Sequence, residues 1–113
     1  VPTFAVHVAS SPAQRSKGLM FVSELPDDGG MLFDFKRPQR VTMWMKNTLI
    51  SLDMLFIRKD GVISSIAEDA VPGSLQTIAS KEQVSAVLEL NGGTSRRLGI
   101  SAGDKIVHEL FEK

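Results

Sequence analysis

The 113-residue sequence contains no cysteine and no excess of charge of either sign. Without cysteine there is no disulfide framework, no thiol nucleophile and no cysteine-based zinc site, so redox chemistry says nothing about the compartment. Thirteen Lys and Arg residues balance 13 Asp and Glu residues, and no global positive field therefore attracts phosphate backbones. We expect no nucleic-acid partner.

Long apolar runs are also missing. No run reaches the roughly 20 residues that a membrane helix needs, and Lys46, Asp53 and Arg58 interrupt the longest stretches. We therefore expect no transmembrane segment in this chain. The shares of hydrophobic residues, 42%, and of charged residues, 23%, are those of a folded globular protein. The length is that of one domain, which we predict over residues 1–113.

Alternating apolar residues and turn residues predict a chain rich in strands. The predicted strands are residues 3–9, 31–35, 41–46, 52–58, 62–67, 84–90 and 105–110. Asp60 and Gly61 indicate a hairpin, closed either by a two-residue turn or by a three-residue loop with a bulge. Residues 71–80, which include Pro72 and Gly73, predict an irregular surface loop.

Two short helices are predicted over residues 12–17 and 94–98 from their capping signals. The residues that carry these signals are Ser11, Pro12 and Gly18 for the first helix, and Asn91 and Gly99 for the second. The fold class is therefore α+β, mainly β, with a small mixed sheet that curls into a barrel or half-barrel and carries two short helices. An open α+β sandwich is the alternative.

Polar residues interrupt the most apolar part of the chain. If residues 43–46 and 52–56 pair as antiparallel neighbours, Lys46 faces Asp53, and Trp44 shares their face. Directly opposed residues have Cβ atoms about 5 Å apart, which allows an ion pair. A two-residue turn at the hairpin would place Glu68 opposite Asp53, whereas a slip of one residue would send Glu68 to the other face.

This arrangement has two interpretations. An ammonium group between carboxylates and beside an indole ring can bind a polar ligand or perform acid–base chemistry. Alternatively, Lys46 and Asp53 form an ion pair at a sheet rim that specifies the fold, and Trp44 belongs to the core. The two histidines, His7 and His108, lack the spacing of metal ligands. We expect no metal ion and no cofactor.

Several motifs spread over the chain carry a family resemblance. They are Arg15-Ser16-Lys17-Gly18-Leu19-Met20, Gly30-Met31-Leu32-Phe33, Trp44-Met45-Lys46-Asn47-Thr48, Leu52-Asp53-Met54, Val87-Leu88-Glu89-Leu90, Gly99-Ile100 and Gly103-Asp104. Together they resemble the domain-of-unknown-function family 192 (DUF 192), over about residues 6–107. The sequence departs from the family pattern at Ser51, where many members have Pro, and at Lys17, where Arg is frequent.

The resemblance implies a compact β-rich domain, often made in bacteria with an N-terminal export signal or membrane anchor, and without an established biochemical function. It therefore supplies no catalytic residues. Because the chain begins with Val1 and Pro2 instead of Met, we expect that an N-terminal segment has been removed. The resemblance then places the protein in the periplasm or outside the cell.

From these observations we predict a binding or accessory module of the bacterial envelope that holds a small polar molecule or a peptide. The candidate ligand-binding residues are Arg15, Trp44, Lys46, Asn47, Asp53 and Glu68. The alternative is an enzyme in which Lys46 and Asp53 act as an acid–base pair. The sequence predicts no oligomeric state.

Overall fold

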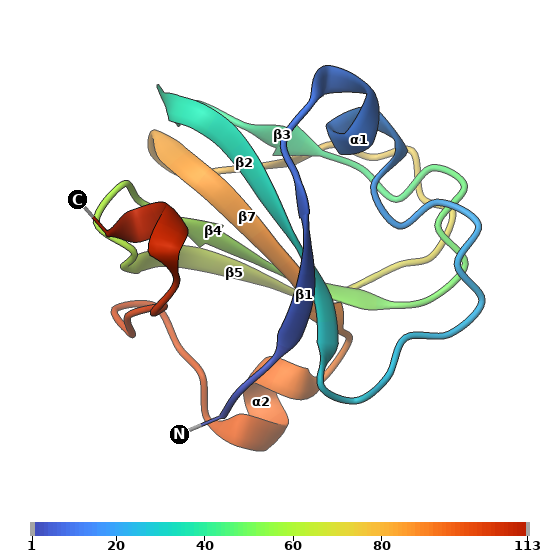
Figure 1. Ribbon diagram of the computed structural model, residues 1–113. Helices are drawn as coiled ribbons and strands as arrows, with labels where there is room; N and C mark the ends of the chain where they lie inside the picture. Colours follow the sequence, from blue (N-terminus) through green and yellow to red (C-terminus); the bar gives the residue numbers. More distant parts are fainter. Residues whose placement is uncertain (1, 113) are drawn as a thin grey trace.

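The computed structural model describes residues 2–112, and its centre is a five-stranded mixed sheet (Figure 1). The strand order is β1 (Ala5–Ala9), β2 (Gly29–Gln39), β7 (Val84–Asn91), β4 (Leu52–Ile57) and β5 (Ile63–Ala70). β1 is parallel to β2, and the other neighbours are antiparallel. β1 and β5 are the edges of this open sheet, so the α+β, mainly β class is confirmed but the barrel is not.

Both short helices begin and end where the sequence predicts. α1 (Pro12–Lys17) has a capping box, in which Ser11 and Gln14 each bind the other's backbone N–H through a side-chain oxygen. α2 (Thr94–Leu98) ends at Gly99 in the left-handed conformation. The prediction that Asn91 caps α2 is wrong, because its side-chain amide donates to backbone carbonyls of residues 25 and 26 instead.

Other elements differ from the sequence prediction. Only Thr42–Met43 of the expected strand 41–46 is extended; this β3 pairs with β6 (Ile78–Ala79), inside the predicted loop. The last predicted strand is reduced to a single bridge between Lys105 and Val62, and a 3₁₀-helix, η1 (Glu109–Phe111), follows it. No helix within residues 2–112 has the length and apolar character needed to cross a membrane.

The hairpin between β4 and β5 uses the longer of the two predicted loops. The N–H of Arg58 donates to the carbonyl of Val62 at 2.9 Å, which leaves three residues in the loop. Leu55 pairs with Ile66, because a register shift between Phe56 and Ile57 offsets the extra residue of the loop. A register shift between Leu52 and Met54 then disturbs the pairing near Glu68.

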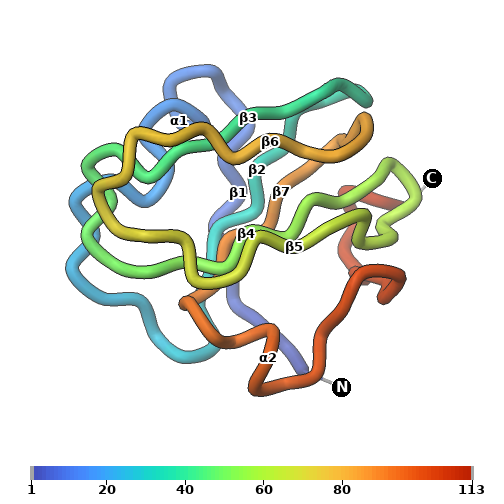
Figure 2. The backbone as a smooth tube through the Cα atoms, turned by 180° about the vertical axis from the view of Figure 1, so that it is seen from behind, coloured from blue at the N-terminus to red at the C-terminus, as the bar shows by residue number. Residues whose placement is uncertain are grey.

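The sheet separates two hydrophobic clusters because alternate side chains of a strand point to opposite faces. Phe33, Met54 and Val87 belong to the cluster on the first face, which α1 and the β3–β6 ribbon cover (Figure 2). Leu32, Leu55 and Leu88 belong to the cluster on the second face, which α2 and the C-terminal segment cover. Both faces of the central strands are therefore buried.

Gly30 allows β2 to approach β7 closely. A Cβ atom at this position would lie 2.7 Å from the carbonyl oxygen of Glu89 and 2.8 Å from a methyl carbon of Leu90. We expect Gly30→Ala to lower the free energy of unfolding by roughly 2–3 kcal/mol, because backbone must move to relieve the overlap. Urea unfolding measures the change. Gly29→Ala, with no contact below 3.1 Å, is the milder control, and equal losses in both variants would contradict this account.

Candidate functional site

Asp53 does not face Lys46, contrary to the sequence prediction. Its side chain is fully buried and accepts hydrogen bonds from the backbone N–H groups of Asp69, Gly93 and Ser95, at 2.8–3.0 Å. Two of these donors belong to the start of α2, whose own N-cap residue supplies no side-chain bond. Asp53 therefore caps α2 and fixes the β4–β5 bulge, on the sheet face opposite Phe33 and Val87.

The predicted row of Lys46, Asp53 and Glu68 is likewise absent. Glu68 lies at the surface and pairs with Arg96 at 3.1 Å. Lys46 lies in a turn after β3, and its ammonium nitrogen is 5.1 Å from the centre of the Trp44 ring. The row depended on pairing residues 43–46 with residues 52–56, whereas β4 pairs with β5 and β7.

Trp44, Lys46 and Arg15 do come together, at a cavity on the first face of the sheet. The cavity has a volume of about 310 Å³, and β2, α1 with the turn after it, and the turn after β3 form its walls. Trp44 is 44% exposed, so it does not belong to the core. The sequence therefore identified three of the residues that line this cavity.

The acidic residue of the cavity is Glu89, which no motif or spacing in the sequence indicated. Glu89 lies in β7 between Met31 of β2 and Met54 of β4, and only 4% of its surface is exposed. No hydrogen bond or ion pair to another residue among 2–112 offsets the desolvation of its carboxyl group, which borders the cavity. Burial in this apolar surrounding raises the pKa of Glu89 to about 8. The floor of the cavity is thus a carboxyl group that is mainly protonated at neutral pH.

Cationic side chains lie around the cavity. Arg15 donates through one nitrogen to the carbonyls of Ser10 and Asp34, and its guanidinium lies 5.4 Å from the centre of the Phe35 ring. These contacts hold Arg15 in place while other N–H groups of the guanidinium are still available for a ligand. Lys46 has its own aromatic contact with Trp44. The cavity therefore combines fixed cations with aromatic surfaces above a neutral acid.

Asn47 does not line the cavity, although its backbone shapes the region. It adopts a positive φ of 56° within the turn closed by the N–H of Thr48 and the carbonyl of Met45. Its carbonyl accepts from the N–H of Phe21, which joins this turn to the segment after α1. Asn47 thus connects two walls through its main chain.

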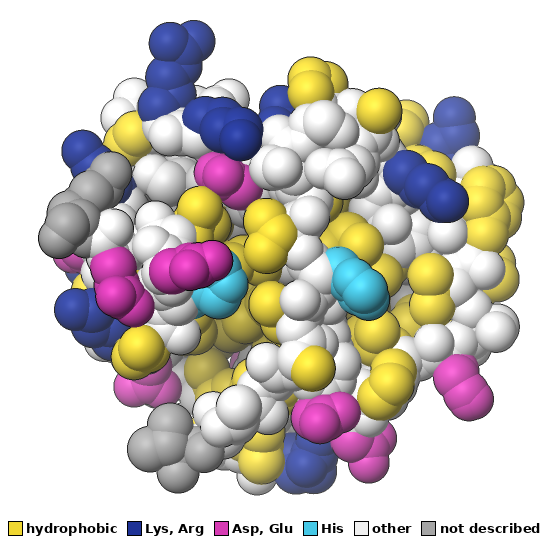
Figure 3. All heavy atoms as spheres, viewed as in Figure 1, with side chains coloured by type: hydrophobic (Ala, Val, Ile, Leu, Met, Phe, Trp, Pro, Cys, Tyr) yellow, Lys and Arg dark blue, Asp and Glu magenta, His cyan; other side chains and the backbone are white. Residues whose placement is uncertain are grey.

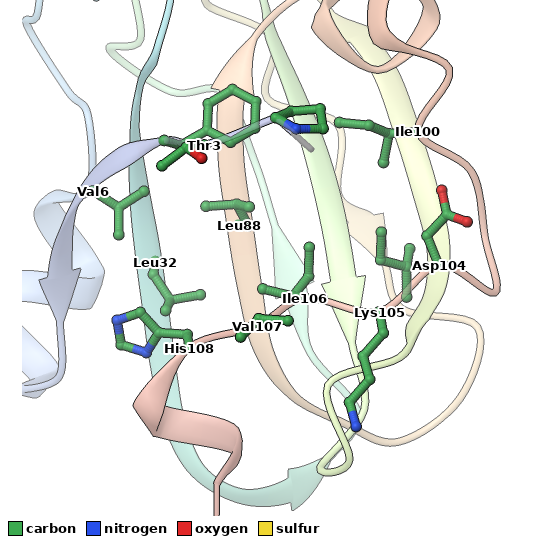
Figure 4. A pocket seen from close by; sticks show the side chains of 13 residues that line it. Thr3, Val6, Leu32, Leu88, Ile100, Asp104, Lys105, Ile106, Val107 and His108 are labelled. Carbon is green, nitrogen blue, oxygen red and sulfur yellow. The ribbon is translucent and has the colours of Figure 1, made fainter.

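A second, larger cavity of about 580 Å³ lies on the other face of the sheet. Figure 3 shows a hollow with hydrophobic side chains near the middle of the molecule, and Figure 4 shows the aliphatic side chains of Val6, Leu32 and Leu88 on one side of it. Ile106 and Val107 of the C-terminal segment also line it (Figure 4). Asp104, Lys105 and His108 also line this cavity, and none of these three residues is buried.

Comparison with known proteins places the chain in a family. The family model described as "Uncharacterized ACR" (DUF192) matches residues 2–108. The chain belongs to the DUF192 family. This membership confirms the resemblance seen in the sequence motifs. No curated protein matches the chain.

Two solved structures closely resemble this DUF192 chain. One, from Sinorhizobium meliloti 1021, is described provisionally as a transcription regulator; it is 53% identical with a TM-score of 0.89, over 90% of this chain and 79% of that one. The other, from Novosphingobium aromaticivorans DSM 12444, is of unknown function. It is 42% identical with a TM-score of 0.91, and the match covers 93% of this chain and 75% of that one. These relatives support the fold and give no specific function. Our expectation of no nucleic-acid partner stays a prediction.

Proposed function

We propose that this protein binds a small ligand with an apolar part and an anionic group in the cavity between Trp44 and Glu89. One observation carries the proposal: a buried carboxyl group without a protein partner forms the floor of a cavity whose surroundings hold cations and an exposed indole ring. Buried polar groups in folded proteins are nearly always hydrogen-bonded, so an unpaired group needs an explanation. A ligand group that pairs with Glu89 supplies one.

The walls indicate which ligand would fit. Arg15 and Lys46 favour a carboxylate or phosphate, because a guanidinium and an ammonium form strong charge-assisted hydrogen bonds with such groups. Phe33, Phe35 and Trp44 offer ring surfaces for an apolar part. The volume lies near the lower end of the range for small-molecule sites. We therefore favour a small molecule over a long peptide.

Acid–base catalysis is a second candidate. The version that pairs Lys46 with Asp53 has no support, because Asp53 is engaged in capping α2. Glu89 is a better acid, since a pKa of about 8 keeps a carboxyl group protonated near neutral pH. A reaction catalysed by Glu89 would lose its rate as pH rises through 8 and would be lost in Glu89→Gln.

A role in the bacterial envelope stays a prediction, which fractionation of cells that make the protein from its own gene tests.

The single tryptophan of the chain allows a direct test of binding. We expect small aromatic carboxylates such as 3-phenylpropionate to change the fluorescence of Trp44 in a saturable way. Lys46→Glu should weaken this binding by about tenfold, because it replaces an attractive charge at the cavity with a repulsive one.

Lys59→Glu is the matched control, because Lys59 lies in the β4–β5 loop and does not line this cavity. It makes the same change of charge and should leave the affinity nearly unaltered. If the two variants bind alike, or if no aromatic anion alters Trp44 fluorescence, the proposed site is wrong.

A further inference from the structure

We infer that the ligand of this cavity is a free amino acid with an apolar side chain, whose ammonium group pairs with Glu89 and whose carboxylate contacts Arg15 and Lys46. This inference rests on the proposed function and names the class of ligand for the same site. Three features of the cavity carry it: the character of its floor, the charges around it and the nature of its walls.

The carboxyl group of Glu89, at the floor of the cavity, favours a ligand with a cationic hydrogen-bond donor. The carboxyl group of Glu89 is buried between methionine-bearing strands, and neither Met31 nor Met54 can donate a hydrogen bond to it. A neutral hydroxyl group on a ligand would stabilise the carboxylate form less than an ammonium group would, because it contributes a hydrogen bond but no opposite charge. An ammonium group stabilises the ionised form, because opposite charges attract strongly where water is excluded.

The charges around the cavity call for an anion on the same ligand. Arg15 and Lys17 from α1 and Lys46 from the turn after β3 are the charged groups that line it besides Glu89. An amine without a negative group would be repelled by these three cations on its way to the floor. A zwitterion meets both requirements, because its carboxylate can stay with the cations while its ammonium group pairs with Glu89.

The walls and the volume limit the rest of the ligand. Ring surfaces from β2 and from Trp44 favour an apolar side chain. A cavity of about 310 Å³ suits a single amino acid such as phenylalanine or leucine better than a longer peptide. The side chain would then lie against the aromatic residues while the two charged groups are held apart from it.

The test uses three ligands of nearly equal size. L-Phenylalanine has both charged groups, 3-phenylpropionate lacks the amine, and L-phenylalanine amide lacks the carboxylate. We expect calorimetric titration and Trp44 fluorescence to show L-phenylalanine binding at least about tenfold more tightly than either analogue, since a charged hydrogen bond is lost in each. L-Leucine and its deaminated analogue repeat the comparison with an aliphatic side chain.

Substitutions assign each charged group of the ligand to its partner. Glu89→Gln should weaken the binding of L-phenylalanine by at least about tenfold. It should change the affinity for 3-phenylpropionate by less than about threefold, because only the ammonium group of a ligand depends on the carboxylate of Glu89. Lys46→Met should weaken the binding of L-phenylalanine and of 3-phenylpropionate, and it should leave the affinity for L-phenylalanine amide nearly unchanged. Thermal unfolding of each variant shows that the comparison is made on folded protein.

Proton release gives an independent signature. In the free protein at pH 7 Glu89 is mainly protonated, and pairing with an ammonium group ionises it. Binding of L-phenylalanine should therefore release close to one proton, measured by titration in buffers of different ionisation enthalpy. 3-Phenylpropionate should release almost none, and Glu89→Gln should abolish the release.

The outcomes separate the two proposals. Tighter binding of L-phenylalanine together with proton release supports the inference. If 3-phenylpropionate binds as tightly as L-phenylalanine and no proton is released, the amino-acid inference is wrong while the proposed anion-binding site stands. If no compound of either series binds, both are overturned.

Discussion

Replacement of Asp53 by alanine is expected to lower the free energy of unfolding by roughly 4 kcal/mol, because it leaves three N–H groups, one buried and two partly buried, without their acceptor. Two of these groups belong to the start of α2, and the third belongs to Asp69 in the β5 bulge. The side chain is fully buried, so water cannot replace the lost bonds without opening the structure. Urea unfolding followed by circular dichroism measures the loss.

Two further substitutions test the reason for this loss. Asp53→Asn keeps one oxygen acceptor but directs an NH₂ group at an N–H donor. It should therefore lower the free energy of unfolding by less than Asp53→Ala does, but still by a large amount. Asp60→Ala removes a carboxylate that accepts from the N–H of Val62 at the exposed hairpin loop, where water can take its place. If the Asp53 and Asp60 variants lose equal stability, Asp53 does not hold α2 in the way described.

Replacement of Glu89 by glutamine is expected to stabilise the protein at neutral pH, by roughly 4 kcal/mol at pH 7.5. The folded-state pKa of Glu89 is about 8, above the usual 4.5. Between these values the unfolded chain releases its proton and the folded protein does not, so wild-type stability falls by about 1.4 kcal/mol for each pH unit from 4.5 to 8. Glutamine cannot ionise, and the variant escapes this loss.

The measurement is chemical unfolding of both proteins at pH 5, 6, 7 and 8. The difference between them should be small at pH 5 and should grow towards pH 8. Glu82→Gln, at an exposed ion pair with Arg58, is the matched control and should show no growth over this range. A wild-type–Glu89→Gln difference independent of pH would show that the carboxyl group is not desolvated in the folded protein.

A stabilising substitution at Glu89 would also bear on function. Groups that lower stability are retained in proteins when binding or catalysis requires them, because selection acts on function above a stability threshold. The same Glu89→Gln variant is expected to lose affinity for an amino acid. Gain of stability with loss of binding in one variant would link the two properties to a single carboxyl group.

Local signals in the sequence were sufficient for the helices and for one hairpin. The signals of Ser11 and Pro12 and the stops at Gly18 and Gly99 depend on residues only a few positions apart, so α1 and α2 were predicted at their observed bounds. The loop at Asp60 and Gly61 is likewise local, and its three-residue form was one of the two predicted alternatives. The strand over 41–46 was wrong because most of it pairs with nothing in the sheet and forms the cavity turn.

The candidate site was found only in part. Trp44 and Lys46 stood out as polar or amphipathic residues among methionines, and both line the cavity. Glu89 did not stand out, because Ser85, Val87 and Glu89 alternate with Ala86, Leu88 and Leu90. That alternation is what a strand with one solvent-exposed face would show. No signal in the strand itself reveals that a second layer covers this face.

The sequence by itself determined the fold class, the two short helices and the family, since these depend on nearby residues and on motifs along the chain. Tertiary structure alone decided the strand order, and with it the separation of Asp53 from Lys46 and the position of Lys46 and Glu89 in the lining of one cavity. The physical reason is that strand pairing joins residues far apart in the chain, and one change of neighbour or register moves a side chain to the opposite face.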